Sequence, residues 1–459
     1  MKKLNISNST QKIFLIAILI LLFLVPVSLI KNLVGDRNRY QQEAIRSITE
    51  PLGGQAEIQG LVVAIPYKKY RDVYDTKGNK HTEFDIEHVI FAPDQLDLEI
   101  SVKPYYLSRG IFKVPVFNGQ IELKADFADF DFSYFNISEA DVIKKDAVLI
   151  LGFSNTKNLT KQPNLKMNGE QLQVSPIKYD TISPFTASVY YPLALSKTTG
   201  TNATGNGGGN GASSPFVLSG SIDFQGGQNI RLRPIAQENN FKMKSDWKSP
   251  SFSGGWLPTE RELSDKGFSA VWNIAGLSTV YPKSWLAKTE YYAESVDISF
   301  MIPVDSYKKT ERSVKYALLF LLIPFLALLI SEIFSKTRIH PVQYCLIGLA
   351  DVIFYLLLLS ISEHISFDLA YLICSITVCV ATLLYSMAIF KNKKWGLLLS
   401  GVQLVSYVFL YGTLQAEDYA LLIGSIGLFV VIALLMFITR KIDWYSLNGE
   451  ENKNVTIIN

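Results

Sequence analysis

The sequence predicts an integral membrane α-helical bundle, with one N-terminal and five C-terminal helices and a large, mostly-β extracytoplasmic domain inserted between helices 1 and 2. The mean hydropathy is +0.19, whereas soluble proteins of this size usually score below zero. Apolar residues are concentrated at 13–30 and again from Ala317 onward. The long polar stretch between these blocks alternates apolar and polar residues over short runs, which is the period of β-strands.

The first membrane helix is predicted at residues 13–30, IFLIAILILLFLVPVSLI. Its 18 residues span about 27 Å at 1.5 Å each, close to the thickness of the hydrocarbon layer. Lysines precede it, as in a signal peptide, but the apolar run is longer and no small-residue cleavage pattern follows. We therefore predict an uncleaved anchor within residues 1–35, and an outward helical continuation over 37–50.

Five further spans are predicted in a bundle covering residues 312–445, followed by a cytoplasmic tail at 446–459. The connections between them are short, so consecutive helices are expected to be antiparallel neighbours. The spans lie at about 316–334, 342–361, 367–390, 395–412 and 419–438.

The loop charges predict the orientation. Lys and Arg occur in every second loop, and the loops between them, SEHISF and LQAED, contain neither residue. Cytoplasmic loops are enriched in Lys and Arg. This places both termini in the cytoplasm and residues 36–311 in the periplasm of a bacterial inner membrane. The basic residues of the predicted cytoplasmic segments are Lys2, Lys3, Lys12, Lys336, Arg338, Lys391, Lys393, Lys394, Arg440 and Lys441.

The domain at 36–311 is predicted to be a mostly antiparallel sandwich or layered sheet. Turn residues punctuate its alternating runs at Pro93-Asp94 and at Asn118-Gly119, the latter a hairpin signal. Besides 37–50, helical periodicity is found at 257–266. Its 30 Lys and Arg against 32 Asp and Glu give a net charge of −2, so no strong attraction to acidic polymers is expected.

The segment KTTGTNATGNGGGNGASS, residues 197–214, is of low complexity. Its composition cannot bury a core, so a flexible loop is predicted. Two interpretations stay open: the loop separates two β units, 36–196 and 215–311, or it is the extended tip of a hairpin.

No enzyme, cofactor or nucleic-acid partner is predicted. The sequence lacks G-x-x-x-x-G-K-[ST], G-x-S-x-G, H-E-x-x-H, C-x-x-C and EF-hand motifs. The net charge of +3 gives no reason to expect nucleic-acid binding. The cysteines Cys345, Cys374 and Cys379 all lie in apolar segments, so they are expected to pack as small apolar residues.

The segment HTEFDIEHVI contains four potential metal ligands, His81, Glu83, Asp85 and His88. In a strand the first three share one face and His88 points to the other. A solvated β edge is therefore the favoured interpretation, and no metal is predicted.

Asp351 is a polar residue near the middle of a predicted span, where an unpaired charge is costly. It is either functional or satisfied by a hydrogen bond to a neighbouring helix. Glu332 is expected to pair with Lys336 or Arg338. A group of polar residues at the outer mouth of the bundle could bind an ion or a partner, or could simply form external loops: Glu363, His364, Asp368, Glu417 and Asp418.

The segment 247–272 combines large rings with turn residues. We predict that Trp272 is a core residue, because alternation in GFSAVW places it on one face with Phe268 and Ala270. A partly exposed surface that binds a partner is predicted at Trp247, Phe252, Trp256 and Arg261.

The same segment resembles the CreD family of bacterial inner-membrane, cell-envelope integrity proteins. The pattern W-x-x-P-S-F-x-G, L-P-x-x-R-E and G-F-x-A-x-W is formed by Trp247, Pro250, Ser251, Phe252, Gly254, Leu257, Pro258, Arg261, Glu262, Gly267, Phe268, Ala270 and Trp272. The likeness extends from about residue 13 to 447 and includes LVPVSLI at 24–30, LVVAIPY at 61–67, RSVKYALL at 312–319, HPVQYCLIGL at 340–349, FYLLLLSISEHISFDLAY at 354–371, DYALLIG at 418–424 and MFITRKIDWYSL at 436–447.

The resemblance implies an inner-membrane protein linked to envelope integrity, with expression tied to a two-component system and effects on colicin tolerance and β-lactam response. It implies no catalytic residue and no established biochemical activity. The leading hypothesis is a non-enzymatic scaffold or stress-response factor whose external domain binds another envelope protein or component. The expected partners are the lipid bilayer and that component. The alternative is a transporter or flippase-like activity in the bundle, with Asp351 as its intramembrane charge.

Overall fold

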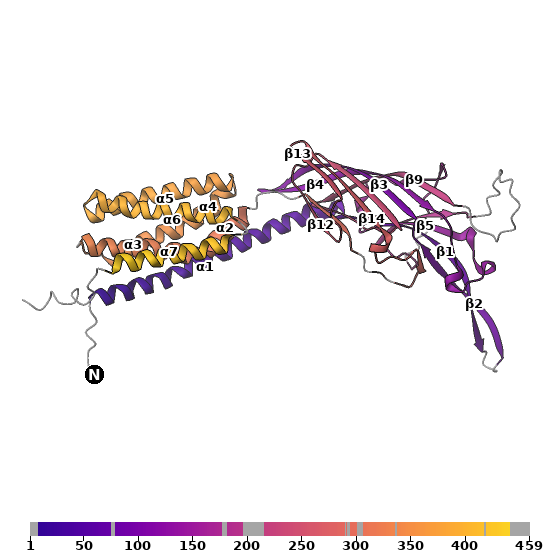
Figure 1. The fold of residues 1–459 in the computed structure, drawn as a ribbon, viewed down its shortest axis with the longest axis horizontal. Coiled ribbons are helices and arrows are strands. Elements are labelled where there is room, and N and C mark those ends of the chain that lie inside the picture. Colours follow the sequence, from indigo (N-terminus) through magenta and orange to yellow (C-terminus); the bar gives the residue numbers. More distant parts are fainter. Residues whose placement is uncertain are drawn as a thin grey trace, which may run out of the picture. The chain divides into compact units, whose positions relative to one another are not determined.

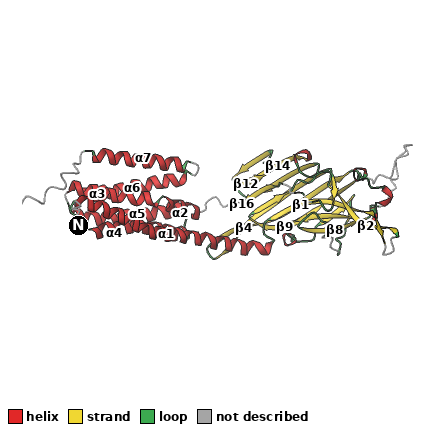
Figure 2. Cartoon of the chain, turned by 90° about the horizontal axis from the view of Figure 1, so that it is seen from below, coloured by secondary structure: helices red, strands yellow, loops and turns green. Residues whose placement is uncertain are grey.

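The computed structural model forms two compact units, one made of residues 1–41 with 304–459 and the other of 42–303. Figure 2 distinguishes the helices of the first unit from the strands of the second. The residues that the structure describes are 8–74, 79–176, 181–195, 215–289, 291, 294–300, 306–335, 337–416 and 419–440.

The N-terminal helix α1 runs without interruption from Asn8 to Thr49. Its apolar half is followed by the polar helix-forming run RNRYQQEAIR, so the predicted continuation over 37–50 is confirmed. The helix ends at a 3₁₀ turn, Glu50–Leu52, and Gly53 then adopts the left-handed conformation with φ of 89°.

Five apolar helices follow the β-rich unit, which confirms the predicted fold class. Together with α1, they are the helices in the described ranges that are long and apolar enough to cross a membrane. Their bounds are α3 Ala317–Ser335, α4 Pro341–Ser362, α5 Phe367–Phe390, α6 Lys393–Gln415 and α7 Ala420–Thr439.

Helix α2, Ser306–Lys315, was not expected from the sequence. It is polar and amphipathic, and it packs in the helical unit with Thr310 and Ser313 fully buried. Its segment lacks the apolar content that marks a membrane helix, so the hydropathy pattern did not reveal it.

Close packing of α1, α3 and α4 depends on Gly348 of α4. A Cβ atom there would lie 2.5 Å from the Phe325 ring and 2.6 Å from the Phe23 ring. These two rings stack with centroids 6.1 Å apart. The absence of a side chain at Gly348 therefore lets three helices meet around an aromatic pair.

The β-rich unit contains two eight-stranded sheets (Figure 1). The first has the order β12-β16-β10-β1-β2-β15, with β5 on β1 and β8 on β5; the second has the order β13-β14-β11-β3-β4-β9-β6-β7. The strands of the first sheet are β1 Ala56–Tyr74, β2 Lys80–Phe91, β5 Ala147–Phe153, β8 Ala187–Leu193, β10 Asn229–Leu232, β12 Pro250–Gly254, β15 Ser284–Leu286 and β16 Val296–Phe300. Those of the second are β3 Gln95–Arg109, β4 Phe112–Phe127, β6 Asn164–Met167, β7 Glu170–Gln171, β9 Phe216–Gly227, β11 Glu238–Ser245, β13 Glu260–Ser264 and β14 Gly267–Ala275.

The two sheets pack face to face around one hydrophobic core. Phe117 of β4 contacts Phe300 of β16 with ring centroids 5.3 Å apart, and Phe252 of β12 contacts Trp272 of β14 at 5.7 Å. Trp272 is 0% exposed, which confirms its predicted place in the core. Most neighbouring strands are antiparallel, as predicted, but β10 runs parallel to β1 and β11 runs parallel to β3.

The hairpin predicted at Asn118-Gly119 is wrong. Both residues lie within β4, and the chain turns earlier, at Gly110-Ile111, where Arg109 pairs with Phe112. Gly119 serves packing instead, because a Cβ atom there would lie 2.5 Å from the Phe224 ring on β9. The turn predicted at Pro93-Asp94 is confirmed between β2 and β3.

The helical period at 257–266 is also misleading. Residues 260–264 form the edge strand β13, which pairs antiparallel with β14. The turn closes at Gly267, whose φ of 136° disfavours a side chain. The five residues of β13 are all exposed and mostly polar. Such a composition is compatible with a solvated edge strand as well as with the solvated face of a helix.

The low-complexity loop at 197–214 lies outside the described residues. The strands on either side of it, β8 and β9, belong to different sheets, so it is not the tip of a hairpin. The single core includes residues from both sides of the loop, from Ala56 to Phe300. The division into two separate β units therefore finds no support in the packing.

Candidate functional site

The β1–β2 hairpin extends beyond the other strands of its sheet (Figure 1). In its outer part, residues 68–74 of β1 pair with residues 80–86 of β2, beginning with Lys68 opposite Ile86 and ending with Tyr74 opposite Lys80. The neighbouring strand β5 pairs with β1 only up to Ala64, and β15 pairs with β2 only from Val89. Among the described residues, the outer edges of 68–74 and 80–87 therefore carry no further strand.

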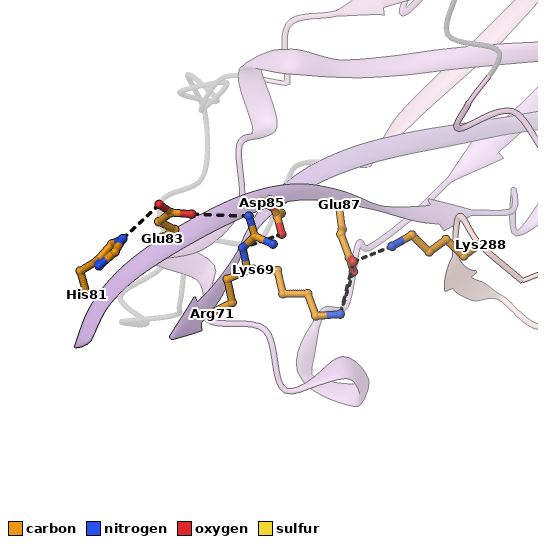
Figure 3. A network of polar contacts seen from close by, with 7 residues as sticks. All are labelled: Lys69, Arg71, His81, Glu83, Asp85, Glu87 and Lys288. Carbon is orange, nitrogen blue, oxygen red and sulfur yellow. Dashed lines mark hydrogen bonds and ion pairs between the residues drawn. The ribbon is translucent and has the colours of Figure 1, made fainter. Parts of the chain in front are cut away.

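One face of this hairpin is a ladder of opposite charges (Figure 3). Arg71 lies 3.5 Å from Glu83 and 3.3 Å from Asp85, and His81 lies 3.2 Å from Glu83. The guanidinium of Arg71 thus neutralises Glu83 and Asp85, two of the four potential metal ligands of this segment. His88 is half-buried on the opposite face, as the strand alternation predicted.

Glu87 holds the base of the hairpin. Its carboxylate accepts hydrogen bonds from Lys288 at 2.9 Å, from the Tyr67 hydroxyl at 2.9 Å and from Lys69 at 3.2 Å. The hydrogen bond from Lys288 is the largest cause that lowers the pKa of Glu87 to about 2. Lys288 is 201 residues away in the chain, so this contact connects the hairpin to the segment that follows β15.

The other face of the hairpin is aromatic and exposed. Tyr70, Phe84 and Ile86 are 53%, 50% and 55% exposed. The rings of Tyr70 and Phe84 meet edge to face at 6.1 Å, and the Lys68 ammonium lies 5.1 Å from the Phe84 ring centroid. Exposed apolar side chains gathered on one face are typical of interaction surfaces.

The four residues of the predicted binding surface, Trp247, Phe252, Trp256 and Arg261, differ in their exposure to solvent. The three rings are half-buried and pack against the core, and Arg261 is exposed on the edge strand β13. Trp247 contacts the Tyr106 ring at 5.5 Å. That this segment binds a partner stays a prediction.

Asp351 of α4 is 3% exposed and lies in a polar cluster with α6. The Gln403 side-chain amide donates to its Oδ1 atom, and the Tyr407 hydroxyl donates to the same atom at 3.1 Å. Asp351 therefore has the hydrogen bond to a neighbouring helix that is one of the two interpretations of its sequence position. Gln403 and Tyr407 were missed because neutral polar residues in apolar helices carry no distinctive signal.

Two carboxylates in the described part of the helical unit, Glu363 and Asp368, also have partners. Glu363 lies 3.3 Å from Arg37 and accepts from the Tyr307 hydroxyl at 3.2 Å. Asp368 accepts from the Tyr411 hydroxyl at 3.0 Å. Glu417 and Asp418, predicted to join this rim, lie outside the described residues.

Glu332 accepts from the Ile339 amide at 3.0 Å and from the Tyr344 hydroxyl at 2.8 Å. These contacts connect α3 to the start of α4. Lys336, one of the two partners expected from the sequence, lies outside the described residues.

These features define a multi-pass membrane protein with a large two-sheet domain between its first and second membrane helices. The family model described as "Inner membrane protein CreD" matches residues 8–445, and the chain belongs to the CreD family. The protein named "Inner membrane protein CreD" from Escherichia coli (strain K12) is 28% identical over 441 residues, covering 94% of this chain and 92% of its own. The chain is accordingly an inner-membrane protein in contact with the lipid bilayer.

Other similarities are weak. "DNA mismatch repair protein MutH" from Haemophilus ducreyi (strain 35000HP / ATCC 700724) is 24% identical over 116 residues, covering 25% of this chain and 51% of that protein. A crystal structure of an M1 zinc metallopeptidase from Deinococcus radiodurans has a TM-score of 0.22 at 7% identity, covering 45% of this chain and 41% of that one. A TM-score this low supports no inference about shared structure or activity.

Proposed function

We propose that the chain is a non-enzymatic factor that maintains cell-envelope integrity under stress. In this proposal, the β-rich unit lies in the periplasm and binds a polypeptide segment of another envelope protein. The observation that carries it is the outer β1–β2 hairpin, which offers an aromatic face and two strand edges without a partner strand in the described part of the chain.

The chemistry of the hairpin favours an extended polypeptide over other partners. A strand edge presents backbone N–H and C=O groups that a partner strand can pair with, while side chains on one face select its sequence. The charges on the other face are already paired with one another, and Arg71 is shared by two carboxylates. These paired charges therefore keep the outer β1–β2 hairpin soluble, and they are not expected to attract a charged polymer.

The orientation rests on the loop charges. Lys391 follows the last residue of α5, Lys393 and Lys394 begin α6, and Arg338 lies between α3 and α4. Enrichment of basic residues in these loops is typical of the cytoplasmic side. The β-rich unit is inserted after α1 and before α3, so it belongs on the opposite side of the membrane.

The proposal is tested by restoring function in a strain that lacks this chain. The variant Tyr70→Ser, Phe84→Thr, Ile86→Thr removes the exposed apolar face while it keeps strand-compatible residues. It should reach the membrane at the wild-type level but fail to restore resistance to envelope stress. The control Tyr134→Ser removes a ring that is 82% exposed elsewhere in the unit and should restore it fully. Full restoration by the hairpin variant would exclude the hairpin as the binding surface.

In-cell photo-crosslinking identifies the class of partner. A photoreactive amino acid at position 84 should give a discrete protein adduct, and the same amino acid at position 134 should not. Adducts with lipid or glycan alone at position 84 would contradict a polypeptide partner.

A transport activity of the helical bundle is the second candidate. It is favoured by one observation, the buried polar cluster of Asp351, Gln403 and Tyr407 between α4 and α6. Ionisable residues within membrane helices commonly mark ion or substrate paths.

A further inference from the structure

Two membrane-spanning helices share a carboxyl–amide pair that is sealed from solvent. Asp351 of α4 is 3% exposed and Gln403 of α6 is 1% exposed. The Gln403 Nε2 group donates to Asp351 Oδ1, which leaves one oxygen on each side chain for further bonding.

Those two oxygens, Asp351 Oδ2 and Gln403 Oε1, are buried and have no hydrogen-bond partner in the described part of the chain. Both accept hydrogen bonds, and an amide oxygen and a carboxylate oxygen cannot satisfy each other without a proton between them. Leaving a buried polar atom unpaired costs about 1–3 kcal/mol.

No positively charged side chain pairs with Asp351 in the part of the chain that the structure describes. The polar and titratable groups that act on Asp351 are Tyr355 on its own helix, Cys379 on α5, and Gln403 and Tyr407 on α6. All are neutral at pH 7 in their ordinary form, and no ion pair of Asp351 occurs among the described residues. A carboxylate held in the membrane without a counter-charge would be strongly unfavourable.

We propose that Asp351 is a proton-binding site of the bundle, and that its carboxyl group is protonated and donates from Oδ2 to Gln403 Oε1. One proton then removes the net charge and satisfies both unpartnered oxygens. The result is a cyclic acid–amide pair, with one hydrogen bond in each direction between α4 and α6. The Tyr407 hydroxyl adds a third bond to Oδ1 and fixes the orientation of the carboxyl group.

The pair also links proton occupancy to helix packing. If the proton leaves, the bond from Oδ2 is lost, and an anion faces the Gln403 amide oxygen. Release of the proton therefore weakens the contact between α4 and α6 at this point. Proton binding at Asp351 does not depend on the envelope role proposed above, and it is compatible both with a bundle that transports and with one that only anchors.

Infrared spectroscopy of the purified full-length protein tests the site directly. The difference spectrum between wild type and Asp351→Asn at pH 7 should contain the carbonyl stretch of a protonated carboxylic acid. In Gln403→Leu this band should shift, because the acid loses its amide partner. A difference spectrum with carboxylate bands alone would overturn the proposal.

Thermal unfolding provides a second readout. Asp351→Asn can form the same two bonds with Gln403 without a proton, so it should unfold close to the wild-type temperature at pH 7. As the pH rises, wild type should lose stability relative to Asp351→Asn, which retains the neighbouring titratable groups Tyr355, Cys379 and Tyr407. Stabilisation of wild type, but not of Asp351→Asn, by sodium over choline would show a metal cation at the site instead of a proton.

Discussion

Two tryptophans of the same segment have different surroundings. Trp272 is fully buried between the sheets, and Trp256 is half-buried and packs against the edge of the core. The alternation of GFSAVW was enough to place Trp272, because strand period alone decides which face a residue occupies. The placement of Trp256 depends on how a Gly- and Pro-rich connection lies on the sandwich, which the local sequence does not specify.

We expect Trp272→Ala to lower the free energy of unfolding by about 3–5 kcal/mol, through lost burial and a residual cavity. Trp256→Ala should cost clearly less, because part of that ring is already in contact with water. Thermal unfolding of the two full-length variants, followed by circular dichroism, compares them. Equal losses would remove the basis for treating Trp256 as part of a binding surface.

Glu87 makes a pH-dependent contribution to stability. Its pKa is lowered from 4.5 to about 2, so its ionised contacts stabilise the fold fully above pH 4.5 and are lost as the pH falls through 2. We expect Glu87→Gln to be less stable than wild type by about 1 kcal/mol at pH 7, since Lys69 and Lys288 are largely exposed and screened. The difference should narrow below pH 4.5. A constant difference down to pH 2 would contradict this assignment.

At the scale of elements, the sequence predicted strands and membrane helices but misjudged turns and edges. Asn118-Gly119 has the sequence of a hairpin turn, yet glycine is needed at 119 because the Phe224 ring packs over that position. The segment 257–266 has a helical period, yet its residues 260–264 pair with β14 as the edge strand β13. In both cases tertiary contacts between distant segments override a local preference.

The role of Gly119 is testable by substitution. Gly119→Val adds a β-branched side chain to a strand, which local propensity favours, but it forces a clash with Phe224. We expect a net loss of about 1–3 kcal/mol from overpacking. The double variant Gly119→Val, Phe224→Ala should lose less unfolding free energy than the sum of the losses of the two single variants. Stabilisation by Gly119→Val would indicate that β4 and β9 are not packed in this register.

The low-complexity loop gives a contrasting prediction. Its composition cannot supply apolar burial, and closing a shorter loop changes the entropy little. Deletion of residues 199–212 should therefore change the free energy of unfolding by less than about 1 kcal/mol. The same thermal measurement on the full-length protein decides it, and a large loss of stability would show that the loop is structural.

At the scale of the whole molecule, the membrane architecture was predictable because hydropathy and loop charge act over whole segments. Only part of the polar cluster around Asp351 could be predicted from the sequence. The carboxylate stood out in an apolar helix, but its partners Gln403 and Tyr407 lie 52 and 56 residues away. The strand order was not predictable, since the parallel pairs β1–β10 and β3–β11 join segments far apart in the chain.

Cysteine accessibility in living cells tests whether the β-rich unit lies outside the cytoplasm. In a background where Cys345, Cys374 and Cys379 are replaced by alanine, Phe84→Cys reports on the exposed hairpin and Asn392→Cys on the loop between α5 and α6. A membrane-impermeant maleimide should label position 84 in cells with an intact inner membrane, and position 392 only after lysis. Labelling of position 392 in intact cells, with position 84 protected until lysis, would contradict the orientation and with it the proposed envelope role.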